Sequence, residues 1–211
     1  MERDTLFFRM LDVIEADIVP LTARGVTLGN KVFGAAVLRK DDLSLVVAGT
    51  NHEAFSPLWH GEVYTIKLFY ELQGHPDPSE CIFLSTHEPC SMCISALAWA
   101  GFRDIYYFFG YEQTQDDFNI PHDLRMLREV FGCAEPTKDN IYYTSRSLQD
   151  LSQGVKEPER ARARMDAIRE IYAGLSAVYQ AGEKKMVLNE FHGFVILRAG
   201  FSLEGSDYVF Q

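Results

Sequence analysis

The sequence predicts an α/β protein, a three-layer α/β/α sandwich with a mixed five-stranded sheet, followed by a helical and hairpin-like C-terminal extension. Three observations support this prediction. Two short apolar runs, 32–38 and 45–48, flank the charged segment 39–42, a pattern typical of a β-hairpin. After residue 60, helical patterns alternate with apolar strand-like runs, as in layered α/β folds. Beyond residue 145 this alternation gives way to one long helical stripe.

The first predicted element is an amphipathic helix over 5–19, because its apolar residues recur at spacings of three and four. Asp4 is placed to cap this helix, and Pro20 is expected to end it. We expect a loop over 21–31, which contains two glycines, before the hairpin begins.

The remaining elements of the first 145 residues follow from apolar periodicity and from the turn residues between the runs. We expect helices over 60–73, 89–100 and 124–131, with Pro89 in the first turn of the second, and strands over 81–84, 105–109 and 141–144.

The C-terminal extension begins with a heptad-like apolar stripe, which predicts a helix over roughly 157–180. Pro158 is expected to start this helix and Gly182 to end it. The stripe consists of Ala161, Met165, Ile168, Tyr172, Leu175 and Tyr179. Such a stripe either packs on its own domain or forms a seam between two copies of the chain. Two further runs, 194–197 and 208–210, have strand-like composition.

The composition bounds the class of protein. The chain has 211 residues, of which 47% are hydrophobic, enough for one domain with a sizeable core. Its four cysteines give no disulfide framework, and no apolar run approaches the length of a membrane span. We therefore expect a soluble cytoplasmic protein with reduced thiols and no membrane partner. The formal net charge of −10 argues against nucleic acid as a partner, because nucleic-acid binders usually carry a basic footprint.

The most informative motif is His60-Gly61-Glu62, followed later by Pro89-Cys90-Ser91-Met92-Cys93. One imidazole and two thiolates provide three zinc ligands, His60, Cys90 and Cys93, and a catalytic zinc keeps its fourth position open for water. Glu62 is a carboxylate beside the ligands that can accept a proton. Two alternatives remain open at this point: a structural zinc site, which would need a fourth ligand, and a redox pair formed by the two cysteines.

The motif resembles that of the cytidine deaminase-like superfamily, and the resemblance covers roughly residues 5–135. It is strongest around Gly49-Thr50-Asn51, His60-Gly61-Glu62 and the segment 86–93. Within the superfamily, Glu88-Pro89-Cys90 is similar to guanine deaminases and tRNA adenosine deaminases. His60-Gly61-Glu62 is more similar to fungal cytosine deaminase, because most relatives carry Ala in the middle. The chain therefore mixes the marks of several subfamilies.

The resemblance implies a hydrolytic mechanism. Zinc would hold a water, and Glu62 would be the catalytic residue that takes the proton of this water and passes protons to a ring nitrogen and to the leaving amine. Ammonia would then leave, and a carbonyl product would remain.

The resemblance also implies substrate contacts, each with a structural alternative. Asn51 matches an Asn that binds the base through its side-chain amide, although Asn is also common in turns. Trp99 resembles a Trp that could stack on a base, or it is a core residue of a buried helix. Asp117 and Phe118 resemble an acidic-aromatic segment that closes the pocket, although an acidic pair is also typical of a solvated turn. His87 is expected to line the pocket mouth or to be exposed.

Three functions are compatible with these features. The first is zinc-dependent hydrolytic deamination of a free nucleobase or related amino-heterocycle, guanine before cytosine. The alternative is a tRNA adenosine deaminase acting on an anticodon loop, which would need a phosphate-binding surface. The third is a non-catalytic subunit, which Glu62 disfavours. We expect a homodimer, with a deaminase domain over 1–145 and an extension over 146–211 that packs on or near the active-site side.

Overall fold

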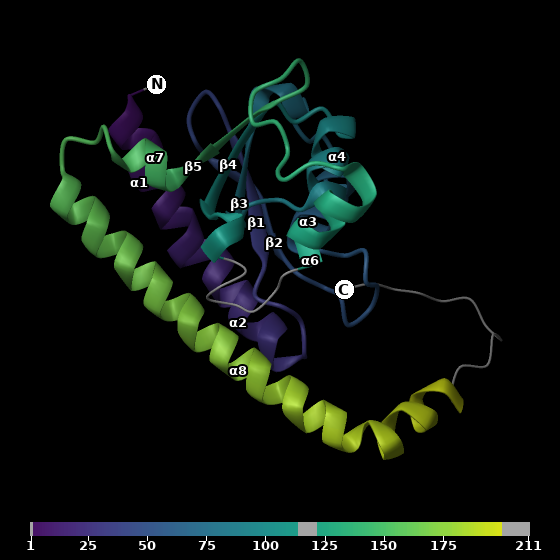
Figure 1. The fold of residues 1–211 in the computed structure, drawn as a ribbon. Helices are drawn as coiled ribbons and strands as arrows, with labels where there is room; N and C mark the ends of the chain where they lie inside the picture. Colours follow the sequence, from purple (N-terminus) through teal and green to yellow (C-terminus); the bar gives the residue numbers. More distant parts are fainter. Residues whose placement is uncertain (1, 114–121, 200–211) are drawn as a thin grey trace.

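A five-stranded mixed sheet forms the middle layer of the computed structural model, which describes residues 2–113 and 122–199 (Figure 1). The strand order is β2-β1-β3-β4-β5, and β1 runs antiparallel to both β2 and β3, whereas β3, β4 and β5 are parallel. The strands are β1 (Gly34–Arg39), β2 (Leu45–Thr50), β3 (Cys81–His87), β4 (Asp104–Phe109) and β5 (Thr144–Ser147). The predicted α/β class and mixed five-stranded sheet are confirmed, although β5 begins where the predicted strand 141–144 ends.

Helices cover both faces of the sheet (Figure 1). On one face lie α1 (Arg3–Val13), α2 (Val19–Thr27) and α8 (Pro158–Ala199), and on the other lie α3 (Gly61–Glu71) and α4 (Ser91–Trp99). The alternation of side chains along β1 serves both layers: Ala36 and Leu38 join the core beneath α1 and α8, whereas Ala35 and Val37 join the core beneath α3 and α4. The shorter helices are η2 (Pro78–Glu80), α6 (His122–Met126), η3 (Leu127–Phe131) and α7 (Leu148–Ser152).

The first helix does not end at Pro20. Residues Ile14–Ile18 form a π-helical turn, η1, and α2 continues from Val19 to Thr27, so the predicted stop and the predicted loop over 21–31 are wrong. A proline lacks the N–H and crowds the carbonyl of the preceding turn, and the widened π turn before Pro20 accommodates this mismatch. The predicted cap is wrong too, because Asp4 lies inside α1 and its carboxylate accepts the backbone N–H of Lys156 at 3.0 Å.

The C-terminal extension is dominated by α8, which runs beside α1 and α2 (Figure 1). Its apolar stripe packs on the chain's own core, because Ala161, Met165, Ile168 and Tyr172 are all buried there. Arg164 fastens the same face to the end of α1 and to residues Ile14–Ile18: its Nη1 lies 2.8 Å from Oδ1 of Asp12, and its Nη2 lies 2.6 Å from Oε2 of Glu15.

Two predictions for the end of the chain are wrong. Gly182 does not end the helix, and residues 194–197 are not a strand, because α8 continues to Ala199. The third expected feature, a strand at 208–210, lies outside the described residues. Among the described residues, no helix is both long enough and apolar enough to cross a membrane.

Candidate metal centre and active site

Two helix starts meet beside the carboxyl end of β3. His60 is the N-cap residue of α3, and Cys90 is the N-cap residue of α4, so both lie at positive helix ends. Cys93 follows within the first turn of α4 and is fully buried. Pro89 lies just before the helix rather than in its first turn. The β-strand between the two helices therefore brings residues 30 positions apart into contact.

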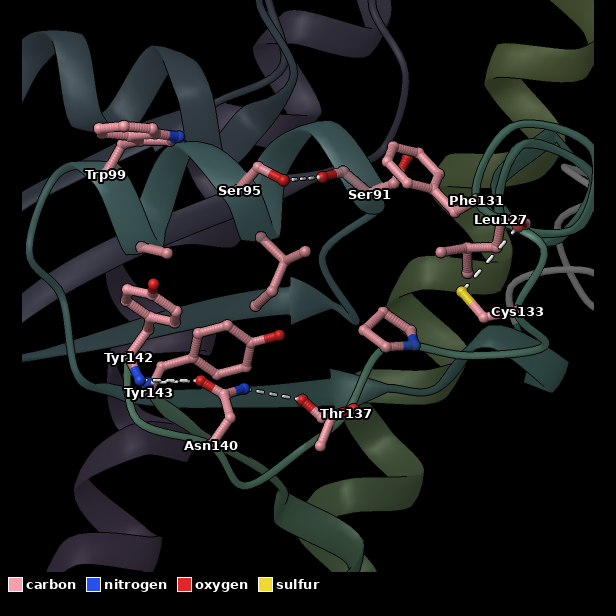
Figure 2. Close-up of a pocket in the computed structure, with 13 residues that line it drawn as sticks. Ser91, Ser95, Trp99, Leu127, Phe131, Cys133, Thr137, Asn140, Tyr142 and Tyr143 are labelled. Carbon is pink, nitrogen blue, oxygen red and sulfur yellow. Dashed lines mark hydrogen bonds between the residues drawn. The ribbon is translucent and has the colours of Figure 1, made fainter.

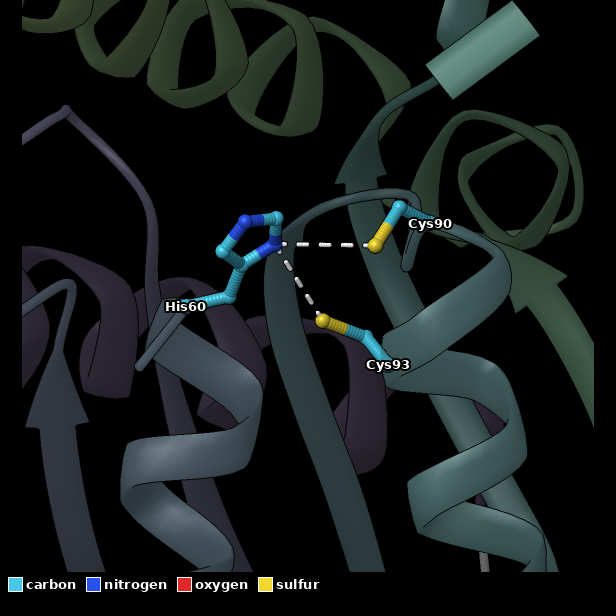
Figure 3. A group of neighbouring side chains, drawn as sticks. All are labelled: His60, Cys90 and Cys93. Carbon is cyan, nitrogen blue, oxygen red and sulfur yellow. Dashed lines mark hydrogen bonds between the residues drawn. The ribbon is translucent and has the colours of Figure 1, made fainter. Parts of the chain in front are cut away.

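The three predicted ligands form one compact group (Figure 3). The Nδ1 atom of His60 lies 3.5 Å from Sγ of Cys90 and 3.5 Å from Sγ of Cys93, and all three ligand atoms lie within 4.8 Å of one another. A tetrahedral zinc with ordinary bond lengths would hold its nitrogen and sulfur ligands about 3.6 Å apart. The observed separations match this value, so the group fits a zinc ion bound through Nδ1. No fourth protein ligand joins the group among the described residues, as a catalytic zinc requires.

The protonation states in the metal-free chain reflect the crowding of these groups. A hydrogen bond from Cys93 and, after it, the neighbouring His60 together lower the pKa of Cys90 to about 4, against the opposing effect of burial. Burial works to lower the pKa of His60, but the hydrogen bond with Cys90 and the charges of Cys90, Glu62 and Glu53 raise it to about 9. Burial and the neighbouring Cys90 raise the pKa of Cys93 well above its ordinary value. At neutral pH, Cys90 is therefore a thiolate paired with a protonated His60.

Glu62 lies beside the ligand group without belonging to it. The residue is only 4% exposed, and its Oε1 accepts the hydroxyl of Ser85 at 3.0 Å. Its Oε2 lies 3.4 Å from Sγ of Cys93, which donates to it. Burial, and then the charge of Cys90, raise the pKa of Glu62. A buried carboxyl with a raised pKa that contacts a metal ligand is suited to accept and return protons.

Asn51 lies at the end of β2 with its side-chain amide engaged by the chain itself. It is fully buried, and its Nδ2 donates to Oε2 of Glu53 at 2.7 Å. Its Oδ1 accepts the backbone N–H groups of Glu53, at 3.1 Å, and of Lys31, at 3.3 Å. The amide therefore supports the loop that leads to His60, as expected for an Asn in a turn.

Trp99 lies far along α4 from the metal group. It is 92% exposed, so the core alternative for this residue is wrong, and a helical rise of about 1.5 Å per residue puts it roughly 13 Å from Cys90 along the helix axis. Trp99 lines a cavity of about 630 Å³ between α4 and the segment that contains Tyr142 and Tyr143 (Figure 2). None of the three metal ligands lines this cavity. Asp117 and Phe118, the other two predicted substrate contacts, lie outside the described residues.

His87 is not exposed. Its ring is 2% exposed and packs between Phe33 and Phe109, with Tyr172 of α8 at a ring-centre distance of 5.7 Å. Burial lowers the pKa of His87 to about 3, so the ring is neutral and belongs to the core.

Sequence reasoning missed two residues of the site. Ser85 stands out only as a polar residue at the end of an apolar strand, on the face that turns toward α3. Glu53 carries no local signal. It reaches His60 because the loop between β2 and α3 folds back, with its Oε1 at 3.5 Å from Nε2 of His60.

The mixed sheet and the histidine–cysteine–cysteine group are those of a zinc-binding enzyme site. Comparison with known families points to such a zinc-binding region. Residues 17–109 match the family model of the cytidine and deoxycytidylate deaminase zinc-binding region. Residues 17–109 are therefore similar to the zinc-binding region of the cytidine and deoxycytidylate deaminases.

Two curated relatives are similar to this chain in sequence. The chain is 32% identical to a guanine deaminase of Bacillus subtilis over 92 residues, which are 42% of this chain and 58% of that protein. It is 24% identical to a probable cytosine deaminase of Schizosaccharomyces pombe over 110 residues, which are 50% of this chain and 67% of that protein. The aligned sequence thus spans less than two thirds of the length of the guanine deaminase.

Solved structures of deaminases are also similar to this chain. A guanine deaminase from Nitrosomonas europaea has a TM-score of 0.47 at 19% identity, covering 79% of this chain and 84% of that one. The guanine deaminase from Bacillus subtilis has a TM-score of 0.48 at 23% identity, covering 67% of this chain and 82% of that one.

Proposed function

We propose that this protein is a zinc-dependent hydrolytic deaminase of a free nucleobase or related amino-heterocycle, with guanine as the first substrate to test and cytosine as the second. The observation that carries the proposal is the contact between Glu62 and Cys93: a buried carboxyl touches a metal ligand but stands outside the ligand group. A structural zinc site needs no such carboxyl and would have a fourth ligand, and a redox pair needs no histidine in contact with both thiols.

The reaction replaces the exocyclic amine of an amidine carbon with an oxygen from water and releases ammonia. Zinc held by His60, Cys90 and Cys93 would act as a Lewis acid that lowers the pKa of the attacking water. Glu62 accepts one proton from this water and donates it to the ring nitrogen; it then accepts the second proton from the new hydroxyl group and donates it to the leaving amine. Ser85 holds Oε1 of Glu62, which leaves Oε2 on the side of Cys93 for this transfer. Burial keeps the carboxyl free of bulk water.

Charge favours a small substrate over a tRNA. The densest basic cluster of the sequence is Arg160, Arg162 and Arg164, and each of these arginines is paired with an acidic side chain. Arg160 lies 3.0 Å from Glu157, Arg162 lies 3.7 Å from Glu159, and Arg164 lies 2.8 Å from Asp12. A phosphate-binding surface needs cations that are not already neutralised, so the tRNA adenosine deaminase alternative has no support in this cluster.

The other predicted roles stand as proposals with different support. The substrate contacts Asn51, Trp99, Asp117 and Phe118 rest on the resemblance alone. The homodimer also rests on the resemblance, because the stripe on α8 is used within the chain. The division at residue 145 is a proposal about domains, and the packing of α8 on α1 and α2 argues that the first part of the extension folds with the deaminase domain.

A screen for ammonia release tests the function. Purified protein would be assayed with guanine, cytosine, adenine, their nucleosides and amino-triazines, and, in parallel, with a tRNA anticodon stem-loop. We expect ammonia from at least one free base, with kcat/KM of at least about 10³ M⁻¹s⁻¹ for guanine. Deamination of the stem-loop with no turnover of any small molecule would replace the proposal by its alternative.

A further inference from the structure

A second carboxylate touches the metal centre from outside. Glu53 lies in the loop between β2 and α3, and its Oε1 is 3.5 Å from Nε2 of His60, on the opposite side of the ring from the cysteines. The side chains of Glu53 and His60 are only 18% and 20% exposed. The contact is therefore a half-buried ion pair, and a movement of about 0.5 Å brings it to ordinary hydrogen-bond length.

Two neighbours hold Glu53 in this position. Asn51 donates its Nδ2 to Oε2 of Glu53 at 2.7 Å, and the Nζ of Lys31 lies 2.9 Å from Oε1. The backbone N–H of Glu53 also bonds back to Oδ1 of Asn51. Because Asn51 is fully buried, its amide restricts the movement of the Glu53 carboxylate more than an exposed partner would.

We propose that Glu53 is a positioning residue of the metal centre, held in place by Asn51. The inference rests on the zinc site of the proposed function. A histidine that binds metal through Nδ1 must carry its proton on Nε2, and a carboxylate facing Nε2 favours that tautomer and fixes the plane of the ring. The negative charge also makes the imidazole a stronger ligand, while Lys31 offsets the excess charge.

The competing interpretation is that Glu53 only pairs with Lys31 as part of the surface. That interpretation predicts that the loss of Glu53 and the loss of Lys31 change the stability of the fold equally, and that neither loss changes the zinc affinity. The present inference predicts that the loss of Glu53 weakens zinc binding more than the loss of Lys31, because Lys31 does not contact His60 directly.

The test measures the zinc affinity of the parent protein and of Glu53→Ala, Glu53→Gln and Lys31→Ala by competition with a chromophoric chelator. Glu71→Ala is the matched control, because Glu71 pairs with Lys67 on α3 at the surface. Removal of a carboxylate behind a metal-binding histidine typically weakens metal affinity about 10–100-fold. We expect a loss of that size for Glu53→Ala, a smaller loss for Glu53→Gln, which keeps an acceptor oxygen, and less than about a 3-fold change for Lys31→Ala and Glu71→Ala.

A second readout separates positioning from general damage to the fold. The absorption spectrum of the cobalt-substituted protein reports ligand geometry, and we expect it to shift in Glu53→Ala at an unchanged melting temperature. If Glu53→Ala and Glu53→Gln both bind zinc within about 3-fold of the affinity of the parent, the role of Glu53 is overturned, whereas the zinc site of the proposed function is not. A parent protein that binds no zinc overturns the metal centre and this inference together. If Glu53→Ala does not fold, Glu53→Gln decides by the same criterion.

Discussion

The thiol of Cys93 lies 3.4 Å from the carboxylate of Glu62, so a metal ligand and the proposed proton carrier share one buried contact. The two residues come from different helices, α4 and α3, and meet only because the sheet places both helix starts at the end of β3. The contact links metal binding to proton transfer, and the predictions below separate these two roles.

Zinc affinity should depend steeply on pH. In the metal-free chain, Cys90 is already ionised at neutral pH, since its pKa is lowered to about 4, whereas His60, with a pKa raised to about 9, and Cys93 still hold protons. Zinc must displace at least these two protons, so the logarithm of the affinity should rise by about two per pH unit between roughly pH 5 and pH 8. Chelator competition at several pH values measures the slope. An affinity that does not change with pH would show that the ligands are wrongly assigned.

Gly61→Ala should destabilise the fold. A Cβ at this position would lie 2.7 Å from the backbone oxygen of Phe33, and neither backbone can move easily. We expect a loss of about 1–3 kcal/mol in the free energy of unfolding, as for other overpacked sites. Gly174→Ala on α8 is the control: a Cβ there meets nothing within 4 Å, so this change should be neutral or should stabilise by about 0.5–1 kcal/mol. Denaturant unfolding compares the variants, and equal stability of Gly61→Ala and the parent would refute the packing argument.

The packing around Gly61 bears on the resemblance of His60-Gly61-Glu62 to cytosine deaminase. In the sequence, glycine at this position resembles cytosine deaminase. In the structure, the approach of α3 to β1 already explains the glycine, so Gly61 alone is not a sign of the substrate.

Tyr172→Ala should show that α8 belongs to the core. Tyr172 is fully buried against His87 and Phe109, and truncation of a buried aromatic residue costs about 3–5 kcal/mol. Val178→Ala on the same helix is the control, because Val178 is 54% exposed and its loss should cost about 0.5 kcal/mol or less. A chain in which Tyr172→Ala melts like the parent would make α8 a separate extension after all.

The fold and the metal ligands could be predicted because their signals are local. The hairpin is marked by apolar runs around a charged turn, and the ligands lie at helix starts within short motifs. Pro20 misled the prediction because a π turn, which has no sequence signature, carries the helix through it. Gly182 also gave no stop, because α8 runs on to Ala199.

The surroundings of the ligands could not be predicted from spacing. Glu53 reaches His60 through a folded loop, and the exposure of Trp99 depends on how α4 packs rather than on its own pattern. The resemblance predicts that Asn51 contacts the substrate, and the structure adds two partners for its amide, Glu53 and Lys31. Glu53 is a local turn partner, whereas no pattern in the sequence connects Lys31, 20 positions away, to Asn51.

The most direct test of the central claim compares zinc content and ammonia release in the parent protein and in Glu62→Gln. Glu62 stands outside the ligand group, so both proteins should hold one zinc per chain. Loss of the proton carrier should lower kcat for the best base by about 10²–10⁴-fold or more, since one carboxyl serves several steps. Cys93→Ser should lose zinc and activity together, whereas Cys133→Ser, which lies outside the ligand group, should keep both. A Glu62→Gln variant with near-normal kcat would contradict the mechanism, and one that loses its zinc would contradict the assigned role of Glu62.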